Sequence, residues 1–445
     1  MHNKIFLPII IFVLVISVAL AIGGCSDIKY YEQDSEPSST KLRFYWNWAD
    51  SGNKSVTLNE IIDNFLNHNP NITIESEYSG DDTFYQKLQI DFATHNAPDI
   101  ISMQPGNIIY NLIDNNQLAD LSYLYTENPN LRITIKESSS MELTRNEKIY
   151  GLPLEERYIM LYINTDIFKF CEADIPSDFS ELYTAVEKIK AKGITPIAYC
   201  ASDSSLLYQV IINSLSSDEN FSSFNDENAA NVYSGALDEL KYLYEIGAFS
   251  DNCLTTTPYE QNLLFINKQA AMIVQDSSFP GVIDAMQKIN TSISDSDNTV
   301  GSFNAVEFPV KTTTYIAGIP SNQKSYIKGL GDATFYASAD AFENKAKKDA
   351  ISSLFLHLTD EKNLSLLTRN AKFIPSTTTV LDSEYYNSLI TQMNLQIMDA
   401  LSINDMPELI FPESIWNSEI ITKIPSMLVG NITSEEIINN IKQSY

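Results

Sequence analysis

The chain has 445 residues, of which 44% are hydrophobic and 11% aromatic, so it can bury real cores and is not disordered. Its 29 Lys and Arg against 57 Asp and Glu give a formal net charge of −28. A surface this acidic excludes electrostatic binding to nucleic acid or to anionic lipid headgroups, and we expect no nucleic-acid partner.

Residues 1–24 have the pattern of a secretory signal peptide. Lys4 supplies a positive charge near the start, and an apolar run from Ile5 to Leu20 follows. The segment ends in Ile22-Gly23-Gly24-Cys25, which resembles the lipobox of bacterial lipoproteins, where the signal is cut before the cysteine and its sulfur is acylated. We therefore expect Cys25 to carry lipid and to anchor the chain to the outer face of the cell membrane.

An uncleaved transmembrane anchor is the alternative, because the apolar run approaches the ~20 residues that span a bilayer. Both hypotheses place the remaining chain outside the cytoplasm. Residues 25–40 then form the lipidated cysteine and a polar, Ser-rich tether. As flexible coil, a tether of this length reaches roughly 20 Å.

Strands and helices alternate at the start of the mature chain. Strands are predicted at 42–46, 72–74 and 99–101, with a helical pattern in each interval. Thr57 and Glu60 match a capping box at the start of the first helix. This β-α-β-α-β order favours a parallel sheet with helical crossovers.

The same alternation continues through the middle of the chain. Strands are predicted at 158–163 and 194–199, and two helices are expected to end at Gly193 and Gly247. From about residue 347 helices dominate, and Thr433 with Glu436 forms a second capping box before the last of them.

Motifs for catalysis are absent from the sequence. It contains no G-x-S-x-G, no Walker A loop, no G-x-G-x-x-G and no H-E-x-x-H, so we expect no enzyme, no cofactor and no metal site. Glu155 and Glu156 are adjacent; on a strand they point to opposite faces and cannot flank one glycosidic bond. We expect them to be exposed charges near a chain crossover.

Three cysteines remain after Cys25, namely Cys171, Cys200 and Cys253. Their number is odd and their spacing is wide. Buried free thiols are the expectation, and one disulfide stays open as an alternative.

Six sequence blocks resemble the family 1 extracellular solute-binding proteins, the sugar receptors of ABC importers. They are NPNITI at 69–74, APDI at 97–100, YGLP at 150–153, LYINTDIF at 161–168, GITPIA at 193–198 and FINKQAAM at 265–272. The resemblance covers nearly the whole mature chain. The last block departs from the family pattern, because Asn267-Lys268-Gln269 replaces the usual Asn-Gly-Lys.

The resemblance implies an α/β fold of the two-lobed periplasmic-binding-protein class, type II-like, with parallel-rich sheets flanked by helices and a multi-strand hinge. Lobe 1 is expected at 41–153 with 309–338 returning to it, and lobe 2 at 154–308 completed by 339–445. The hinge crossings are then expected between Pro153 and Tyr158, near Phe308-Pro309, and between Ser338 and Ala341. Ligand would close the lobes by hinge bending.

The resemblance also implies ligand contacts, many of which follow predicted strands, with others at the hinge and in the late helical region. The candidates are Trp46, Asn47, Trp48, Asp50, Asp82, Met103, Gln104, Arg157, Tyr158, Ser278, Phe279, Gly331, Asp332 and Trp416. Some of them have a structural alternative: one of Trp46 and Trp48 as a core residue, Asp82 as a helix N-cap, Arg157 in a salt bridge, and Trp416 in a core. Phe279 stands where many relatives carry Trp.

The implied function is an extracytoplasmic substrate-binding lipoprotein that captures a mono- or oligosaccharide and delivers it to the permease subunits of an ABC importer. We expect a monomer. The alternatives are a receptor of the same fold for a non-sugar solute, a ligand sensor for a membrane kinase, and a secreted glycoside-active enzyme.

Overall fold

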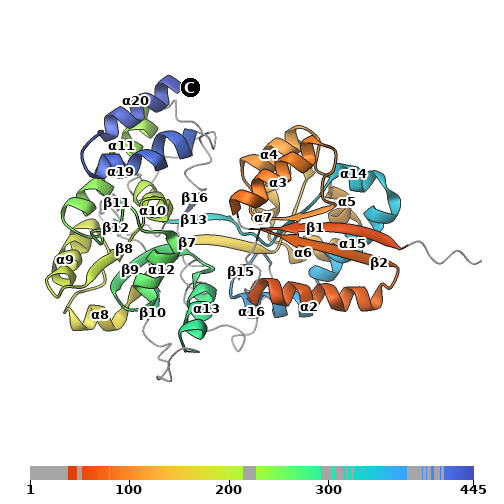
Figure 1. Ribbon diagram of the computed structural model, residues 1–445, viewed down its shortest axis with the longest axis horizontal. Coiled ribbons are helices and arrows are strands. Elements are labelled where there is room, and N and C mark those ends of the chain that lie inside the picture. Colours follow the sequence, from red (N-terminus) through yellow and green to blue (C-terminus); the bar gives the residue numbers. More distant parts are fainter. Residues whose placement is uncertain are drawn as a thin grey trace, which may run out of the picture.

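The computed structural model describes most of the chain after its first 38 residues. The described residues are 39–47, 53–79, 81–213, 227–291, 303–306, 314–316, 319–321, 325–377, 393, 397, 402–404, 411 and 415–444. The predicted signal peptide, Cys25 and the tether up to residue 38 lie outside them. The structure has two lobes joined side by side (Figure 1).

Lobe 1 is built on a five-stranded sheet in the order β2-β1-β3-β14-β6. Its strands are β1 (Thr40–Trp46), β2 (Ile72–Tyr78), β3 (Ile100–Ser102), β6 (Leu152–Pro153) and β14 (Thr334–Ala337). β1 pairs in parallel with β2 and β3, whereas β14 is antiparallel to β3 and β6. A separate hairpin of β4 (Thr144–Arg145) and β5 (Lys148–Ile149) comes directly before β6 in the sequence.

Helices cover both faces of the lobe 1 sheet. They are α2 (Asn53–His68), α3 (Asp81–Ala93), α4 (Asn107–Asp114), α5 (Ser122–Glu127), α6 (Pro129–Thr134), α7 (Glu137–Glu142), α14 (Ala339–Glu343), α15 (Lys345–Leu358) and α16 (Glu361–Ala371). Alternation along β1 divides them: Phe44 and Trp46 pack in one core with α2, α15 and α16, while Tyr45 packs in another with α3 and α4. Both faces of β1 are therefore buried.

Lobe 2 is built on a seven-stranded sheet arranged around β7 (Glu155–Asn164). Its other strands are β8 (Thr195–Ala198), β9 (Ala270–Asp276), β10 (Phe303–Val306), β13 (Ser325–Leu330), β15 (Ile374–Pro375) and β16 (Ser402–Asn404). β8 with β9 and β13 with β16 are parallel, and every partner of β7 is antiparallel to it. A separate hairpin joins β11 (Thr314–Ile316) to β12 (Ile319–Ser321).

The helices of lobe 2 also lie on two faces. They are α8 (Thr165–Phe170), α9 (Phe179–Lys190), α10 (Ser205–Ile212), α11 (Glu227–Glu245), α12 (Pro258–Ile266), α13 (Phe279–Thr291), α19 (Ile424–Leu428) and α20 (Ser434–Ser444), with a π-helical turn η4 (Trp416–Ile420) and a 3-10 turn η5 (Ile421–Lys423). Ile159 and Leu161 of β7 face the larger core, and Met160 and Tyr162 face the smaller one with α12 and α13. The α/β class and the two-lobed architecture are thus present, with mixed sheets in both lobes.

The lobes are joined where three chain segments run side by side. The Leu154 amide donates to the Ala333 carbonyl (2.9 Å), the Gly331 amide donates to the Glu155 carbonyl (3.0 Å), and the Ser376 amide donates to the Leu154 carbonyl (3.0 Å). The first segment leads from β6 to β7, the second from β13 to β14, and the third from α16 through β15. These backbone bonds make the hinge a small sheet of three strands.

The predicted lobe boundaries differ from this packing in the second half of the chain. The chain crosses from lobe 2 into lobe 1 at 331–333, between β13 and β14. It does not cross to lobe 2 between Ser338 and Ala341, because α14, α15 and α16 pack in the lobe 1 core around Phe44. Among the described helices after residue 338, those from residue 415 onward join the lobe 2 core. The periodicity of the helices was visible in the sequence, but it does not say which lobe their apolar faces cover. The return predicted at Phe308-Pro309 lies outside the described residues.

The two predicted capping boxes have different outcomes. At α20, the Thr433 hydroxyl accepts from the Glu436 amide (3.1 Å) and the Glu436 carboxylate accepts from the Thr433 amide (2.8 Å), which confirms the second box. The first is wrong, because α2 begins at Asn53 and Thr57 lies buried inside it, accepting a hydrogen bond from Asn370 of α16. Gly193 and Gly247 end α9 and α11 at positive φ, as predicted.

The three cysteines that follow Cys25 lie in the interior of the fold. Cys171, Cys200 and Cys253 are buried free thiols. Within the described part of the chain, no helix is both long and apolar enough to cross a membrane.

Candidate functional site

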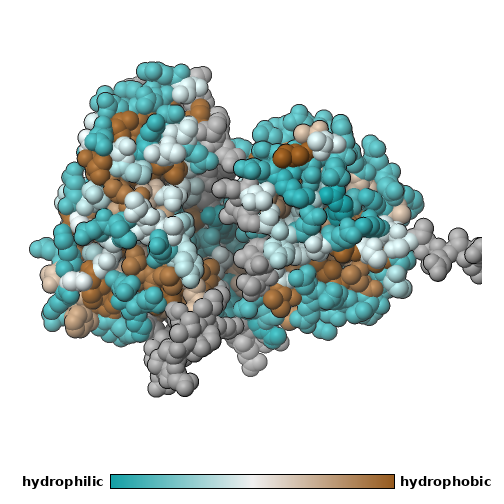
Figure 2. All heavy atoms as spheres, viewed as in Figure 1, coloured by the Kyte–Doolittle hydropathy of each residue, from teal (hydrophilic) through white to brown (hydrophobic). Residues whose placement is uncertain are grey.

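The C-terminal ends of strands from both lobes meet at the hinge. In lobe 1, β1 and β3 run parallel and end at Trp46 and Ser102. In lobe 2, β9 ends at Asp276, which is paired with Ile159 near the start of β7. Polar side chains that follow these strand ends therefore gather between the lobes, where the space-filling view shows the surface notched (Figure 2).

Asn47 and Asp332 form the lobe 1 side of this site. The Asn47 amide nitrogen donates to the Asp332 carboxylate (3.3 Å), and the Ser102 hydroxyl donates to the Asp332 carbonyl (2.7 Å). The buried side-chain oxygen of Asn47 accepts no hydrogen bond from the described residues. This pair leaves both a carboxylate and an amide at the end of the lobe 1 sheet.

Arg157 links the two lobes across the site. Its guanidinium donates to the side-chain oxygen of Gln104 in lobe 1, and its Nε lies 3.2 Å from the Asp276 carboxylate in lobe 2. The other oxygen of Asp276 accepts from the Ser278 amide (2.8 Å) and from its hydroxyl. The structure thus brings Gln104, Arg157 and Ser278 together, and Arg157 also makes the salt bridge that was its alternative role.

Several other predicted site residues are buried in cores. Trp46 stacks on Tyr78 and packs edge-on against Phe44, and Met103 packs in the core around Tyr45. Phe279 is 1% exposed and packs against Tyr162 of β7. Tyr158 is also buried, and its hydroxyl donates to Glu156 (3.1 Å).

Trp416 likewise lies in a core. It is 4% exposed, with its ring between Tyr208 and Phe411, both 5.6 Å away between centroids, and Tyr233 at 6.5 Å. These contacts are those of a packed core residue, which was the alternative. Contact of Trp416 with a ligand stays a prediction.

Three predicted residues are not placed by their side chains. Trp48 and Asp50 lie outside the described residues, and only the backbone of Asp82 is described, as the second residue of α3. Gly331 lies beside Asp332 on the 331–333 crossing.

The structure adds Asp203 to the lobe 2 side of the site. Asp203 follows β8 and accepts from Gln261 and from Gln275 (3.0 Å each) and from the Ser205 amide (2.8 Å). Burial raises the pKa of Asp203 above its ordinary value, although these hydrogen bonds and the positive charge of Arg157 act to lower it. Sequence reasoning missed it, although the signal was a polar residue just after a strand of the same sheet.

Glu155 and Glu156 correct the expectation of exposed charges. They point to opposite faces, as predicted, but both are buried, with 3% and 1% exposed. Glu155 lies 2.6 Å from the Lys54 ammonium, and Glu156 accepts from Lys136 and Lys328. A buried carboxylate requires such partners, so their burial follows from lysines that sequence reasoning did not connect to them.

The charges at the hinge act on one another through the buried interior. Burial lowers the pKa of Lys54, but Glu155, Asp332 and Asp276 outweigh burial and raise it. Burial raises the pKa of Glu155, the neighbouring Asp332 adds to the effect, and Lys54 opposes it. The site is therefore a set of hydrogen-bonding groups of both charges.

In the part of the chain that the structure describes, no cluster of His, Cys, Asp or Glu could hold a metal.

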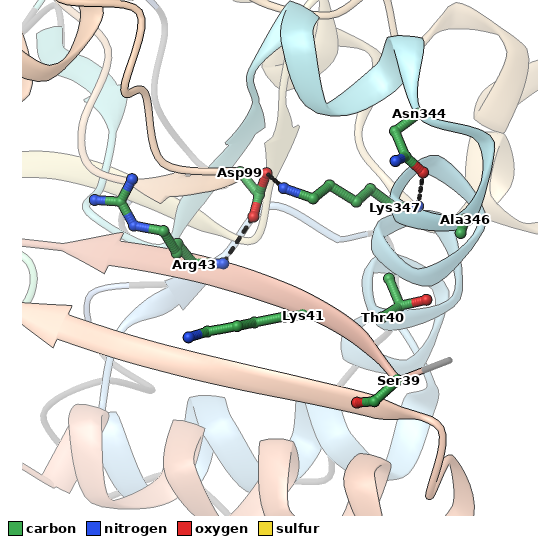
Figure 3. Close-up of a pocket in the computed structure, with 8 residues that line it drawn as sticks. All are labelled: Ser39, Thr40, Lys41, Arg43, Asp99, Asn344, Ala346 and Lys347. Atoms are coloured by element: carbon green, nitrogen blue, oxygen red, sulfur yellow. Dashed lines mark hydrogen bonds and ion pairs between the residues drawn. The ribbon is translucent and has the colours of Figure 1, made fainter. Parts of the chain in front are cut away.

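Two surface hollows lie away from these residues. One, of about 450 Å³, lies in lobe 1 at the first residues of β1, and Figure 3 shows Asp99 between Arg43 and Lys347. Asp99 accepts from the Arg43 amide (2.8 Å) and from Lys347 (2.7 Å), and Lys41 pairs with Glu75. The other, of about 720 Å³, lies between α9 and α11. Neither includes a residue predicted for the site.

Two α/β lobes, a three-stranded hinge and polar groups gathered at the strand ends define a two-lobed binding-protein fold. Comparison with known proteins agrees, because the family model described as bacterial extracellular solute-binding protein matches residues 49–324, more than half of the chain. The chain belongs to this family.

Individual relatives are distant. A multiple sugar-binding protein of Streptococcus mutans is 27% identical over 149 residues, which are 33% of this chain and 34% of that protein, so the chain matches about a third of its length. A chitin oligosaccharide binding protein superposes with a TM-score of 0.74 at 19% identity, covering 92% of this chain and 98% of that one. The GacH receptor of Streptomyces glaucescens, solved unliganded and with acarbose, gives 0.72 at 15% identity, covering 92% and 97%. These structures confirm the fold.

Proposed function

We propose that the protein is an extracytoplasmic receptor that captures a carbohydrate between its lobes and delivers it to the permease of an ABC importer. The observation that carries the proposal is Arg157, which joins Gln104 of one lobe to Asp276 of the other beside the Asn47–Asp332 pair. The names of the relatives, which refer to sugars and oligosaccharides, support the same ligand class.

The chemistry of these groups suits a sugar. Hydroxyl groups both donate and accept, so they match carboxylates, side-chain amides and a guanidinium that can fork to two oxygens. A buried polar group left without its partner costs about 1–3 kcal/mol, which gives selectivity among sugars. Arg157 and Asp276 form an ion pair on the lobe 2 side of the hinge, and a ligand hydroxyl inserted between the lobes can exchange with part of that pairing.

A thermal-shift screen over mono- and oligosaccharides tests the proposal. A ligand at 100 times its Kd adds about 2.7 kcal/mol to the folded state, which raises the melting temperature measurably. Arg157→Met should abolish the shift, whereas Arg132→Met, an exposed arginine on α6, should keep it. A shift with non-sugar solutes alone would contradict a carbohydrate ligand.

Membrane attachment is a separate part of the proposal. It rests on the sequence before Cys25, which lies outside the described residues. Wild type and Cys25→Ala should differ in cell fractionation, with the wild type retained on membranes and carrying lipid mass. Equal retention without lipid on the wild type would rule out the lipoprotein while leaving the receptor function standing.

A further inference from the structure

Asp332 is carried by a short crossing that depends on Glu155. The Gly331 amide donates to the Glu155 carbonyl (3.0 Å), and the Ala333 amide donates to the Glu155 carboxylate (3.1 Å). The residues on both sides of Asp332 are therefore fixed by one residue of β7. The carboxylate of Asp332 is left to face Asn47.

Gly331 fits this arrangement because it has no side chain. A Cβ added to Gly331 would lie 2.2 Å from the carboxyl carbon of Glu155, closer than any real contact. The Glu155 carboxylate thus occupies the space beneath the crossing. Its position sets how close the crossing comes to β7.

Lys54 connects the same carboxylate to the start of α2. Its ammonium lies 2.6 Å from Glu155, and their side chains are only 17% and 4% exposed. Lys54 also lies over the ring of Phe373, next to the third hinge segment (5.5 Å to the centroid). Since Lys54 lies in the first turn of α2, this ion pair ties the start of α2 to the crossing that carries Asp332.

We infer that Lys54 and Glu155 are positioning residues for the ligand site, holding Asn47 and Asp332 at their mutual distance without binding the ligand themselves. This inference rests on the proposed function, because it takes Asn47 and Asp332 as ligand contacts. The pair acts through the 331–333 crossing and the start of α2.

Glu156 supplies a matched control. It is the next residue, equally buried, and also paired with lysines. Its carboxylate points to the other face of β7, where it accepts from Ser139 (2.7 Å) and Tyr158 (3.1 Å) and not from the 331–333 crossing. A variant at 156 therefore perturbs the hinge charge without touching the support of Asp332.

The test compares Glu155→Gln and Lys54→Met with Glu156→Gln and Lys54→Arg. The first readout is hydrogen exchange of the 331–334 segment in the ligand-free protein, measured by mass spectrometry. The second is the Kd of the sugar found in the screen. Glu155→Gln and Lys54→Met should speed exchange at 331–334 and raise the Kd at least tenfold. Glu156→Gln and Lys54→Arg should leave exchange at 331–334 unchanged and the Kd within threefold of wild type.

The two readouts separate the possible failures. Equal loss of affinity in Glu155→Gln and Glu156→Gln would overturn the inference, and so would unchanged exchange at 331–334 in both Glu155→Gln and Lys54→Met. If the wild type binds no sugar, the proposed function fails, and the exchange of the ligand-free variants still decides whether the pair holds the crossing. Should Glu155→Gln not fold, Lys54→Met carries the test.

Discussion

At the scale of single residues, Glu155 and Glu156 divide their tasks because strand neighbours face opposite ways. Glu155 supports the crossing with Asp332, and Glu156 lies among Lys136, Lys328 and Ser139. The opposite facing could be predicted from sequence. Their burial could not, because it depends on lysines that come close only when both lobes are folded.

The free energy of unfolding should depend on pH through the ionisation of Glu156. Burial raises its pKa, but Lys136 and Lys328 outweigh burial and hold it below the ordinary value. A pKa depressed in the folded state adds stability above the unfolded-state pKa of about 4.3, and that stability is lost as pH falls through the folded pKa. Glu156→Gln should therefore lower the unfolding free energy by about 3 kcal/mol at pH 7 and by progressively less toward pH 3. Urea unfolding across this range checks it; a loss independent of pH would contradict it.

Trp416 should act mainly through packing. Because its ring lies among Tyr208, Tyr233 and Phe411, Trp416→Ala should remove about 3–5 kcal/mol of stability from the ligand-free protein. Differential scanning calorimetry measures this loss. The Kd of the folded variant tests the ligand role separately, since stacking on a sugar would weaken binding about tenfold when lost. A variant as stable as wild type would contradict the core placement.

At the scale of elements, local sequence signals predicted the type and the ends of helices and strands better than the elements that they pack against. The strands and the C-terminal glycines of α9 and α11 agree with their patterns, since these depend on neighbouring residues. The same threonine-and-glutamate pattern succeeded at 433 and failed at 57. Thr57 is covered by α16, and its hydroxyl bonds to Asn370, a contact between segments far apart in sequence.

The capping box at 433 gives a direct test. Thr433→Ala removes the acceptor for the Glu436 amide and should cost about 1 kcal/mol, because α20 then begins with an unpaired amide. Thr433→Ser keeps the hydroxyl and should retain most of the stability. Chemical denaturation of both variants distinguishes them. Equal stability of the alanine and serine variants would show that the cap contributes little.

At the scale of the whole molecule, the hinge sets the motion open to the protein. Three segments joined by backbone hydrogen bonds near Leu154 can bend together, while each lobe keeps its own cores. The family blocks in the sequence predicted two lobes. They did not place α14 to α16 in lobe 1, because an amphipathic helix fits either lobe until its partners are known.

The two lobes should close about this hinge when a ligand binds. Small-angle scattering should give a smaller radius of gyration when a tight sugar is bound, since the lobes approach as their polar groups share the ligand. Hydrogen exchange near Leu154 should slow at the same time. A tight ligand that changes neither quantity would contradict closure.

The repeated crossing of the chain also bears on how the protein is made. Lobe 1 takes its β14 from 334–337 and α16 from 361–371, so an N-terminal fragment that ends before these residues lacks part of its sheet or core. Lobe 2 is finished only by α20, at Ser444. A growing chain must therefore wait for its final third before either half can assemble, and contacts this distant in sequence form slowly. A chain that remains unfolded until most of it has been made can pass through a narrow membrane pore in an extended conformation.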